Sequence, residues 1–173
     1  SLYVEAVTAV FMLLCGINFN MHFYLLARQF TQFKRNEELK VFLAIIAAAS
    51  LLVGANTYGS VYSTLEETAR PSGYQVISVA TTTGFQTANP DAWPVFSRMV
   101  LFLLMFMGAC TGSSGGGLKV ARVMLLFKEI RRSLRKVTSP RTVSIISLDG
   151  KAVGIPTLHA ANVYLILYMI VYV

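Results

Sequence analysis

Charged residues are missing from four long stretches of the chain, and each of these stretches is rich in apolar side chains. They cover residues 6–27, 41–65, 99–118 and 152–173. Each is about 20 residues or longer, which is the length that an α-helix needs to cross the ~30 Å hydrocarbon core of a bilayer. The pattern therefore predicts three membrane-spanning helices and the start of a fourth.

Between the second and third stretches lies a segment that predicts a helix too short to span. It covers residues 71–80 and begins at Pro71, a residue that suits the first turn of a helix. At 1.5 Å per residue this helix is about 15 Å long, half the thickness of the hydrocarbon core. Such a length indicates a re-entrant segment, which enters the membrane and returns to the same side.

The third apolar stretch is predicted to break inside the membrane. A helix that starts at Pro94, after the interfacial residue Trp93, reaches the glycine-rich residues 108–117 after about 21 Å. Each glycine costs about 1 kcal/mol relative to alanine in a helix, and three of them are consecutive. The helix should stop there and resume as a basic amphipathic helix. Span, half-helix, loop and broken span together form one M1–P–M2 unit.

Composition and charge set the topology. Only 13% of the 173 residues are charged, against about 25% in a soluble domain. The net charge is +7, and the basic residues cluster in 28–40 and 119–151, whereas 61–93 contains only Arg70. The positive-inside rule predicts that 28–40 and 119–156 are cytoplasmic and that 61–93 lies outside. Basic residues beside a membrane span are first a topology signal, so we do not predict a nucleic-acid partner.

Polar residues in two further places need an interpretation. Asn18, Asn20 and His22 lie in the inner half of the first stretch, where either hydrogen bonds between helices or contact with an ion would explain them. Asp149-Gly150 stands between apolar runs and predicts a small hairpin with a type I′ turn.

The segment SVATTTGFQTA, residues 78–88, has the composition of an ion filter. A loop inside a membrane must satisfy its own backbone groups, and potassium-channel filters do so by using carbonyl oxygens as ion ligands. Glycine supplies the unusual torsions that this requires, and an aromatic residue packs behind the loop. The C-terminal end of the preceding half-helix also favours a cation. The candidate ion-binding residues are Thr81, Thr82, Thr83, Gly84 and Phe85.

Within this candidate filter, K⁺ is predicted at the carbonyls of Thr82, Thr83 and Gly84, and the hydroxyls of Thr81 and Thr82 are further possible ligands. The segment compares with the T-V-G-Y-G signature but has Gln86 in place of the second glycine. The alternative is an ordinary turn on the outer side of the membrane.

The glycine-rich break is the candidate gate. Its residues are Gly108, Gly112, Ser113, Ser114, Gly115, Gly116 and Gly117. A phosphate-binding loop would require G-x-x-x-x-G-K-[ST], but Leu118 separates the last glycine from Lys119. A surface of small residues for close helix packing is a second alternative. A flexible plug on the pore axis, below the filter, is the favoured interpretation.

Taken together, VATTTGF followed by GACTGSSGGGLKVARVMLLFK, with GINFNMHF before them, resembles the ion-translocating subunit of the bacterial Trk/Ktr potassium transporters, in its Trk-type form. The resemblance covers almost the whole chain. It implies an all-α membrane protein in the bacterial inner membrane, with four M1–P–M2 repeats around a pseudo-fourfold pore. It also implies a homodimer surrounded by membrane lipid, and a cytoplasmic regulatory ring of nucleotide-binding domains that contacts surfaces such as 119–151. Thr83 departs from the family at a position where alanine is also expected.

On this resemblance the chain is a fragment centred on the third repeat. Its expected parts are the second helix of the preceding repeat (1–27), a cytoplasmic linker (28–40), one M1–P–M2 repeat (41–136), a cytoplasmic hairpin linker (137–156) and the first helix of the next repeat (157–173). Within the repeat, M1 is 41–60, the pore helix 71–80, the filter 81–85 and the broken M2 94–136.

The resemblance implies potassium uptake without a bound cofactor and without an enzymatic reaction. A sodium-permeable relative remains an alternative, with Rb⁺ or Na⁺ on the same path, because four filter loops decide selectivity jointly. Symport with H⁺ or Na⁺ is not decided by these residues. A membrane-embedded enzyme with a re-entrant loop is the alternative from another class, but His22 and His159 lie far apart in the sequence.

Overall fold

The computed structural model describes residues 2–138 and 146–172. These residues form helices, apart from one 3₁₀ turn and one short hairpin. In chain order the elements are α1 (Leu2–Gly16), α2 (Phe19–Leu26), α3 (Phe30–Arg35), α4 (Glu37–Thr57), α5 (Leu65–Ala80), η1 (Pro90–Ala92), α6 (Val95–Met107), α7 (Val120–Thr138), β1 (Ser147–Leu148), β2 (Lys151–Ala152) and α8 (Ile155–Tyr172).

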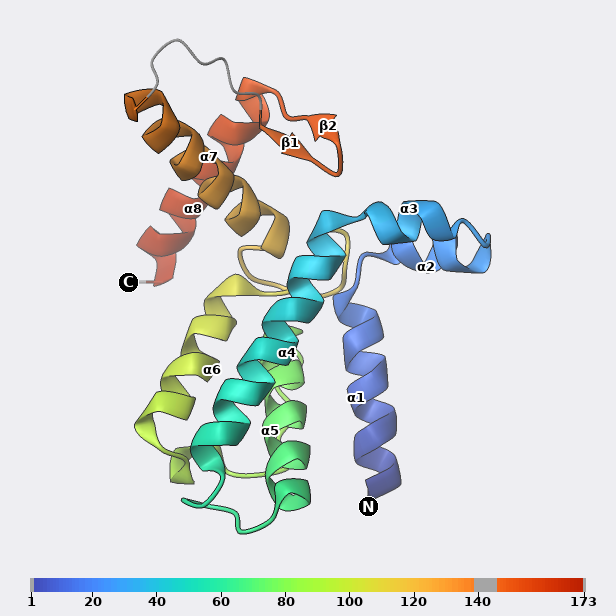
Figure 1. The fold of residues 1–173 in the computed structure, drawn as a ribbon, viewed down its shortest axis with the longest axis vertical. Helices are drawn as coiled ribbons and strands as arrows, with labels where there is room; N and C mark the ends of the chain where they lie inside the picture. Colours follow the sequence, from blue (N-terminus) through green and yellow to red (C-terminus); the bar gives the residue numbers. More distant parts are fainter. Residues whose placement is uncertain (1, 139–145, 173) are drawn as a thin grey trace.

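Four helices lie side by side and two more sit beyond one end of them (Figure 1). Helices α4, α5 and α6 contact one another, and α1 packs on α5. Helices α7 and α8 pack together at the opposite end of the molecule, next to the hairpin, while α2 and α3 project to the side near the start of α4. The connection between α6 and α7 crosses the junction between the two groups of helices.

The core follows the helical period of α4. Its buried apolar residues Phe42, Ile46, Ala49 and Val53 are spaced by four, three and four positions, which places them on one face. They join buried residues of α5, α6 and the connection to α7 in one cluster. This cluster packs α5 against α4 and α6. The candidate filter follows the C-terminal end of α5.

The expected single helix over 1–27 is wrong, because the chain bends by 101° between α1 and α2. The break has a local cause and a distant one. Asn18 caps α2 by accepting a hydrogen bond from the Asn20 N–H at 2.9 Å. The Phe19 N–H donates to the Gly112 carbonyl at 3.1 Å, so the freed backbone of the bend is satisfied by the glycine-rich segment.

Three other boundaries differ from the sequence prediction, and helix capping explains the first of them. Helix α4 begins at Glu37 and not at residue 41, because the Asn36 side chain caps it through the Leu39 N–H at 2.6 Å. The predicted linker 28–40 therefore contains α3 and the first turn of α4. Helix α7 continues to Thr138, and α8 starts at Ile155, each two residues outside the predicted limit.

The pore helix is longer than expected. It starts at Leu65 and not at Pro71, since Thr64 caps it through the Glu67 N–H at 3.3 Å and two glutamates occupy its first turn. Its 16 residues correspond to about 24 Å, and Pro71 lies inside the helix. Its C-terminal residue is Ala80, the predicted end.

The lengths of the helices change the number of membrane spans that the sequence predicted. Within the described ranges, α4 alone is long and apolar enough to cross a membrane by itself, and α1 with α2 meets the same requirement only as a bent pair. Helix α6 is too short because it ends at Met107, before Gly108, whose φ of +69° leaves the helical region. The sequence predicted three spans, with a break in the third. In the described ranges the second is one continuous span, α4, and the first is a bent pair of helices, α1 and α2.

The predicted hairpin is present where the structure describes it. Ser147 pairs with Ala152 and Leu148 with Lys151. Asp149 and Gly150 both have positive φ, at +53° and +73°, as a type I′ turn requires. Residues 139–145 of the predicted hairpin linker lie outside the described ranges.

Candidate functional site

The candidate filter begins as the C-terminal cap of α5. The Thr83 N–H donates to the Ser78 carbonyl at 2.9 Å and the Thr82 N–H to the Val79 carbonyl at 3.0 Å. This pair of bonds is the Schellman motif, in which the residue after the cap adopts a left-handed conformation. Thr82 occupies that position with φ of +58°, although glycine is the usual residue there.

The presence of threonine at this position has a side-chain explanation. A β-branched residue in the left-handed region costs roughly 1–2 kcal/mol. The hydroxyl Oγ1 of Thr82 accepts a hydrogen bond from the Gly116 N–H at 2.8 Å, which a glycine could not do. A hydrogen bond between the filter and the glycine-rich segment therefore offsets the torsional cost at Thr82.

Gly84 gives the loop a second left-handed residue. Its φ is +80°, while Thr81 has φ of −85° and Thr83 lies outside the positive region. Negative and positive φ therefore alternate from Thr81 to Gly84, a backbone course in which the left-handed positions usually hold glycine.

The side chains of Thr81 and Phe85 are not placed as the sequence predicted. Thr81 is buried, and its hydroxyl donates back to the Ile77 carbonyl at 2.8 Å and lies 2.9 Å from the Thr83 hydroxyl. The Thr81 hydroxyl is therefore engaged in capping α5. Phe85, expected to pack behind the filter, is 54% exposed.

The glycine-rich segment, residues 108–117, folds back on itself through very close backbone packing. A Cβ atom on Gly108 would collide with the Gly116 carbonyl, and one on Gly117 would lie 2.9 Å from the Gly108 Cα. Both residues also have positive φ, at +69° and +83°. Side chains are excluded at these two positions, so the glycines are required by contact as well as by torsion.

The same segment is held between the filter and the bend of α1 and α2. Gly115 faces the filter, because a Cβ there would lie 3.0 Å from the Thr81 carbonyl oxygen and 2.6 Å from the Ala109 Cβ. On the other side, the Cys110 N–H donates to the Gly16 carbonyl at 3.1 Å and the Ser114 N–H to the Cys15 carbonyl at 3.2 Å. The two predicted sites, filter and gate, are thus in direct contact.

Two polar residues of the first stretch, Asn18 and His22, make hydrogen bonds at the bend between α1 and α2. Asn18 caps α2 and lies against Gly112, and the Nε2 atom of His22 lies 2.9 Å from the Leu14 carbonyl oxygen. Both interactions stabilise the bend, as expected for polar groups that satisfy a broken helix.

A buried carboxylate that sequence reasoning missed lies next to this site. Glu38, in the first turn of α4, is only 5% exposed. Its Oε1 atom accepts hydrogen bonds from the Thr111 N–H at 2.6 Å and the Ala121 N–H at 3.1 Å. In the sequence it follows Glu37 and falls among the charges of a linker. The signal available there was only an acidic residue at the start of an apolar helix.

A groove of about 480 Å³ opens beside the filter between α5 and α6. Thr82 and Gly84 line one side of it, and Leu101 and Phe102 line the other. The flank of the filter is therefore open on this side and is not covered by the other described elements.

Comparison with known proteins shows the family of this chain. The TrkH family, described as cation transport protein, matches residues 1–173. The Trk system potassium uptake protein TrkH of Escherichia coli K12 is 33% identical over 175 residues, which are 98% of this chain and 36% of the relative. TrkG of the same organism is 26% identical over 166 residues, 95% of this chain and 34% of the relative.

A solved structure shares the fold. The crystal structure of the potassium transporter TrkH from Vibrio parahaemolyticus superposes with a TM-score of 0.91 at 28% identity, over 99% of this chain and 38% of that one. The chain spans about a third of the length of these relatives. The predicted fold class, an all-α membrane protein with an M1–P–M2 unit, is confirmed, and so is the resemblance to the Trk-type subunit. The chain therefore belongs to the TrkH family of cation transport proteins.

Proposed function

We propose that this chain forms one wall of a pore that takes up K⁺, with the backbone carbonyls of Thr82, Thr83 and Gly84 in place of the ion's hydration water. One observation carries the proposal. The pore helix ends in a loop with alternating torsions, and the second residue of that loop is bonded directly to the glycine-rich segment at 2.8 Å. A surface turn on the outer side would not need this contact with the glycine-rich segment.

Electrostatics supports a cation at this loop. The C-terminal end of α5 leads directly into Thr82, Thr83 and Gly84, and a helix of 16 residues carries about half an elementary negative charge at that end. Thr82, Thr83 and Gly84 are exposed within the described part of the chain, so their carbonyls are free to face a pore axis. An anion would be better placed at a helix N-terminus.

The glycine-rich segment is proposed as the gate. Its residues Gly115 and Gly116 touch the filter, and its ends connect α6 to α7. The Gly116 N–H bonds to the Thr82 hydroxyl at 2.8 Å, and a small displacement of the segment breaks this bond to the filter. Movement of this segment away from the filter would open the path to the cytoplasm.

The wider assignment rests on the family. We propose a multi-pass protein of the bacterial inner membrane in which 61–93 lies outside and 28–40 and 119–156 are cytoplasmic. The chain would hold the third of four M1–P–M2 repeats with parts of its neighbours, in a homodimer that a cytoplasmic ring of nucleotide-binding domains regulates. Ion transport is its proposed role, and catalysis is not.

A sodium-permeable pore is the second candidate. It is favoured by Gln86, which stands where the potassium-channel signature has a second glycine. The same experiment separates the two, because it measures the discrimination between K⁺ and Na⁺.

The test uses two glycines with the same torsion and the same free space. Gly84 and Gly59 have φ of +80° and +75°, and a Cβ on either meets nothing within 4 Å. Alanine at either position therefore costs about the same, roughly 1–2 kcal/mol of backbone strain. Gly59 lies in the loop after α4, away from the filter.

We expect Gly84→Ala in the full-length protein to reduce Rb⁺ uptake or K⁺/Na⁺ discrimination by about tenfold, because the strain falls on the ion ligands. Gly59→Ala should leave both unchanged at a similar thermal stability. Equal transport by the two variants would refute the filter role. A wild-type protein that takes up Na⁺ as readily as K⁺ would select the sodium-permeable alternative.

A further inference from the structure

The buried carboxylate of Glu38 joins a residue inside the glycine-rich segment to the start of α7. A single oxygen, Oε1, accepts hydrogen bonds from the N–H of Thr111, just before Gly112, and from the N–H of Ala121, in the first turn of α7. The intervening residues 112–120 are thereby closed into a loop. The positions of both ends depend on one side chain that belongs to a third element, α4.

Charge makes this connection strong. The Ala121 N–H is one of the four that an α-helix leaves without an internal partner at its N-terminus, where a negative charge is also favoured. Hydrogen bonds to an ionised carboxylate contribute more than neutral ones. A carboxylate that is 5% exposed also carries a large desolvation cost, which only such bonds offset. An apolar residue would fill the space at lower cost but would leave both N–H groups unpaired.

The hairpin and α7 also bond to the start of α4, through Asp149, Glu37 and Lys128, a group that we call the clasp. Asp149, in the turn of the hairpin, accepts hydrogen bonds from the Glu37 N–H at 2.6 Å and from the Asn36 side chain at 3.0 Å. Lys128 of α7 bonds to the Glu37 carboxylate at 2.5 Å and to the Ser147 carbonyl at 2.7 Å.

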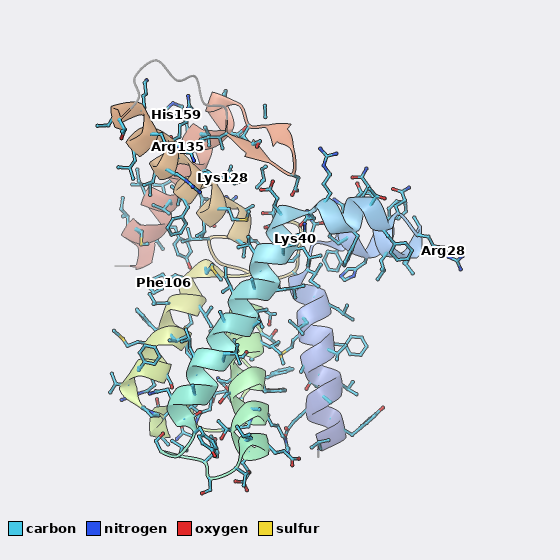
Figure 2. All side chains as sticks on the ribbon, in the orientation of Figure 1. Arg28, Lys40, Phe106, Lys128, Arg135 and His159 are labelled. Atoms are coloured by element: carbon cyan, nitrogen blue, oxygen red, sulfur yellow. The ribbon has the colours of Figure 1, made fainter. Side chains whose placement is uncertain are left out.

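Together these bonds join three elements at one point. Figure 2 shows Lys128 on α7 and Lys40 near the start of α4, the two helices that the clasp connects. The hairpin, α7 and the start of α4 therefore move as one unit as long as these bonds hold.

We propose that Glu38 is a positioning residue of the gate: it latches the glycine-rich segment to α4 and α7 and so keeps that segment against the filter. The clasp formed by Asp149, Glu37 and Lys128 holds the latch in place, so a displacement of the cytoplasmic hairpin or of α7 releases the segment. This inference rests on the proposed gating role of residues 108–117.

Three substitutions of one residue test the latch. Glu38→Gln keeps an oxygen acceptor in the place of Oε1, which receives both bonds. Glu38→Asp withdraws the acceptor by one methylene, about 1.5 Å, beyond the range of both hydrogen bonds. Glu38→Ala removes the acceptor. Glu66→Gln is the matched control, because Glu66 is also a first-turn glutamate but is exposed and lies at the opposite end of the bundle, on α5.

The measurement is Rb⁺ flux through the full-length protein in liposomes without any cytoplasmic partner, together with K⁺/Na⁺ discrimination and the thermal unfolding midpoint. We expect Glu38→Asp to raise basal flux about tenfold over Glu38→Gln with unchanged discrimination, since the loss of two charge-assisted bonds frees the gate and not the filter. Glu38→Ala should behave like Glu38→Asp if it folds. Equal flux in the Asp and Gln variants would overturn the proposal.

A substitution in the clasp tests whether the hairpin acts on the glycine-rich segment through Glu38. Asp149→Asn should raise flux less than Glu38→Asp, and the double variant should conduct no more than Glu38→Asp alone, because both act through the same latch. Additive effects of the two substitutions would show that the hairpin does not act through Glu38.

A variant with residues 112–117 shortened separates the two proposals. If it conducts like wild type, the gating role itself fails. If it conducts more than wild type while Glu38→Asp does not, only the latch fails.

Discussion

Two adjacent glycines of the proposed gate differ sharply in the space around them, which allows the contact between gate and filter to be tested. A Cβ on Gly115 would lie 2.6 Å from the Ala109 Cβ and 3.0 Å from the Thr81 carbonyl oxygen. A Cβ on Gly116 would have one neighbour, the Thr82 hydroxyl, at 3.9 Å. Neither glycine has a left-handed φ, so alanine at either position is free of torsional strain. The two substitutions therefore differ in steric overlap and in little else.

The overlap at Gly115 is large enough to move the segment. Carbon atoms in contact prefer separations of about 3.5–4.0 Å, so the new methyl group would be roughly 1 Å too close to the Ala109 Cβ. Ala109 is fully buried and the Thr81 oxygen belongs to the backbone, so neither can turn aside as a flexible side chain would. Overpacking of this kind typically costs about 1–3 kcal/mol. That cost corresponds to a shift of roughly 5- to 150-fold in an equilibrium between a seated and a displaced segment.

A displacement of about 1 Å also breaks the bond to the filter. The Gly116 N–H lies 2.8 Å from the Thr82 hydroxyl, and a hydrogen bond is lost beyond about 3.5 Å. We therefore expect Gly115→Ala in the full-length protein to increase Rb⁺ flux into liposomes by a factor within that range. Gly116→Ala should conduct like wild type. Any stabilisation that alanine gives by restricting the unfolded chain is the same for both and cancels in the comparison.

Equal flux and equal thermal midpoints for the two variants would refute the reasoning, since they would show that the glycine-rich segment is not packed against Ala109 and Thr81. A lower flux for Gly115→Ala than for Gly116→Ala, at equal stability, would contradict the direction and would indicate that the segment moves toward the pore axis.

Two further outcomes are expected. Gly73 lies in the interior of α5, where a Cβ meets nothing within 4 Å, so Gly73→Ala should raise the free energy of unfolding by about 0.5–1 kcal/mol without changing ion selectivity. A thermal or denaturant melt of the full-length protein measures the change in stability. A loss of stability would mean that another part of the protein fills that space. Removal of two residues from 112–117 should increase Rb⁺ flux, because a shorter segment cannot reach both the filter and the bend of α1; an unchanged flux would locate the barrier elsewhere.

Much of the fold followed from local sequence features. The apolar run of α4 and the glycine break after Met107 were both recognisable, because helix length and glycine torsion depend on a few consecutive residues. The end of the pore helix at Ala80 was also predictable from the polar residues after it. The start of that helix was missed, since the capping by Thr64 outweighed the usual preference of Pro71 for a first turn.

The bend in the first apolar stretch shows where local reasoning stops. Asn18 and Asn20 were visible in the sequence, but the length of the stretch predicted one straight span. The backbone groups that a bend exposes must find partners in a membrane. Those partners are carbonyl and amide groups of the glycine-rich segment, more than 90 residues later, and no local pattern identifies them.

The sequence by itself determined that the chain is a helical membrane protein with a re-entrant threonine–glycine loop, a broken helix and the motifs of its family. These properties come from apolar length, glycine content and residue order, which act over a turn or two of helix. Only the tertiary structure decided that the filter and the glycine-rich segment touch, through Thr82 and Gly116, and that Glu38 closes the segment from α4. The partners in these contacts are 34 and 73 residues apart, and folding brings them together because each satisfies a polar group that lipid would leave unpaired.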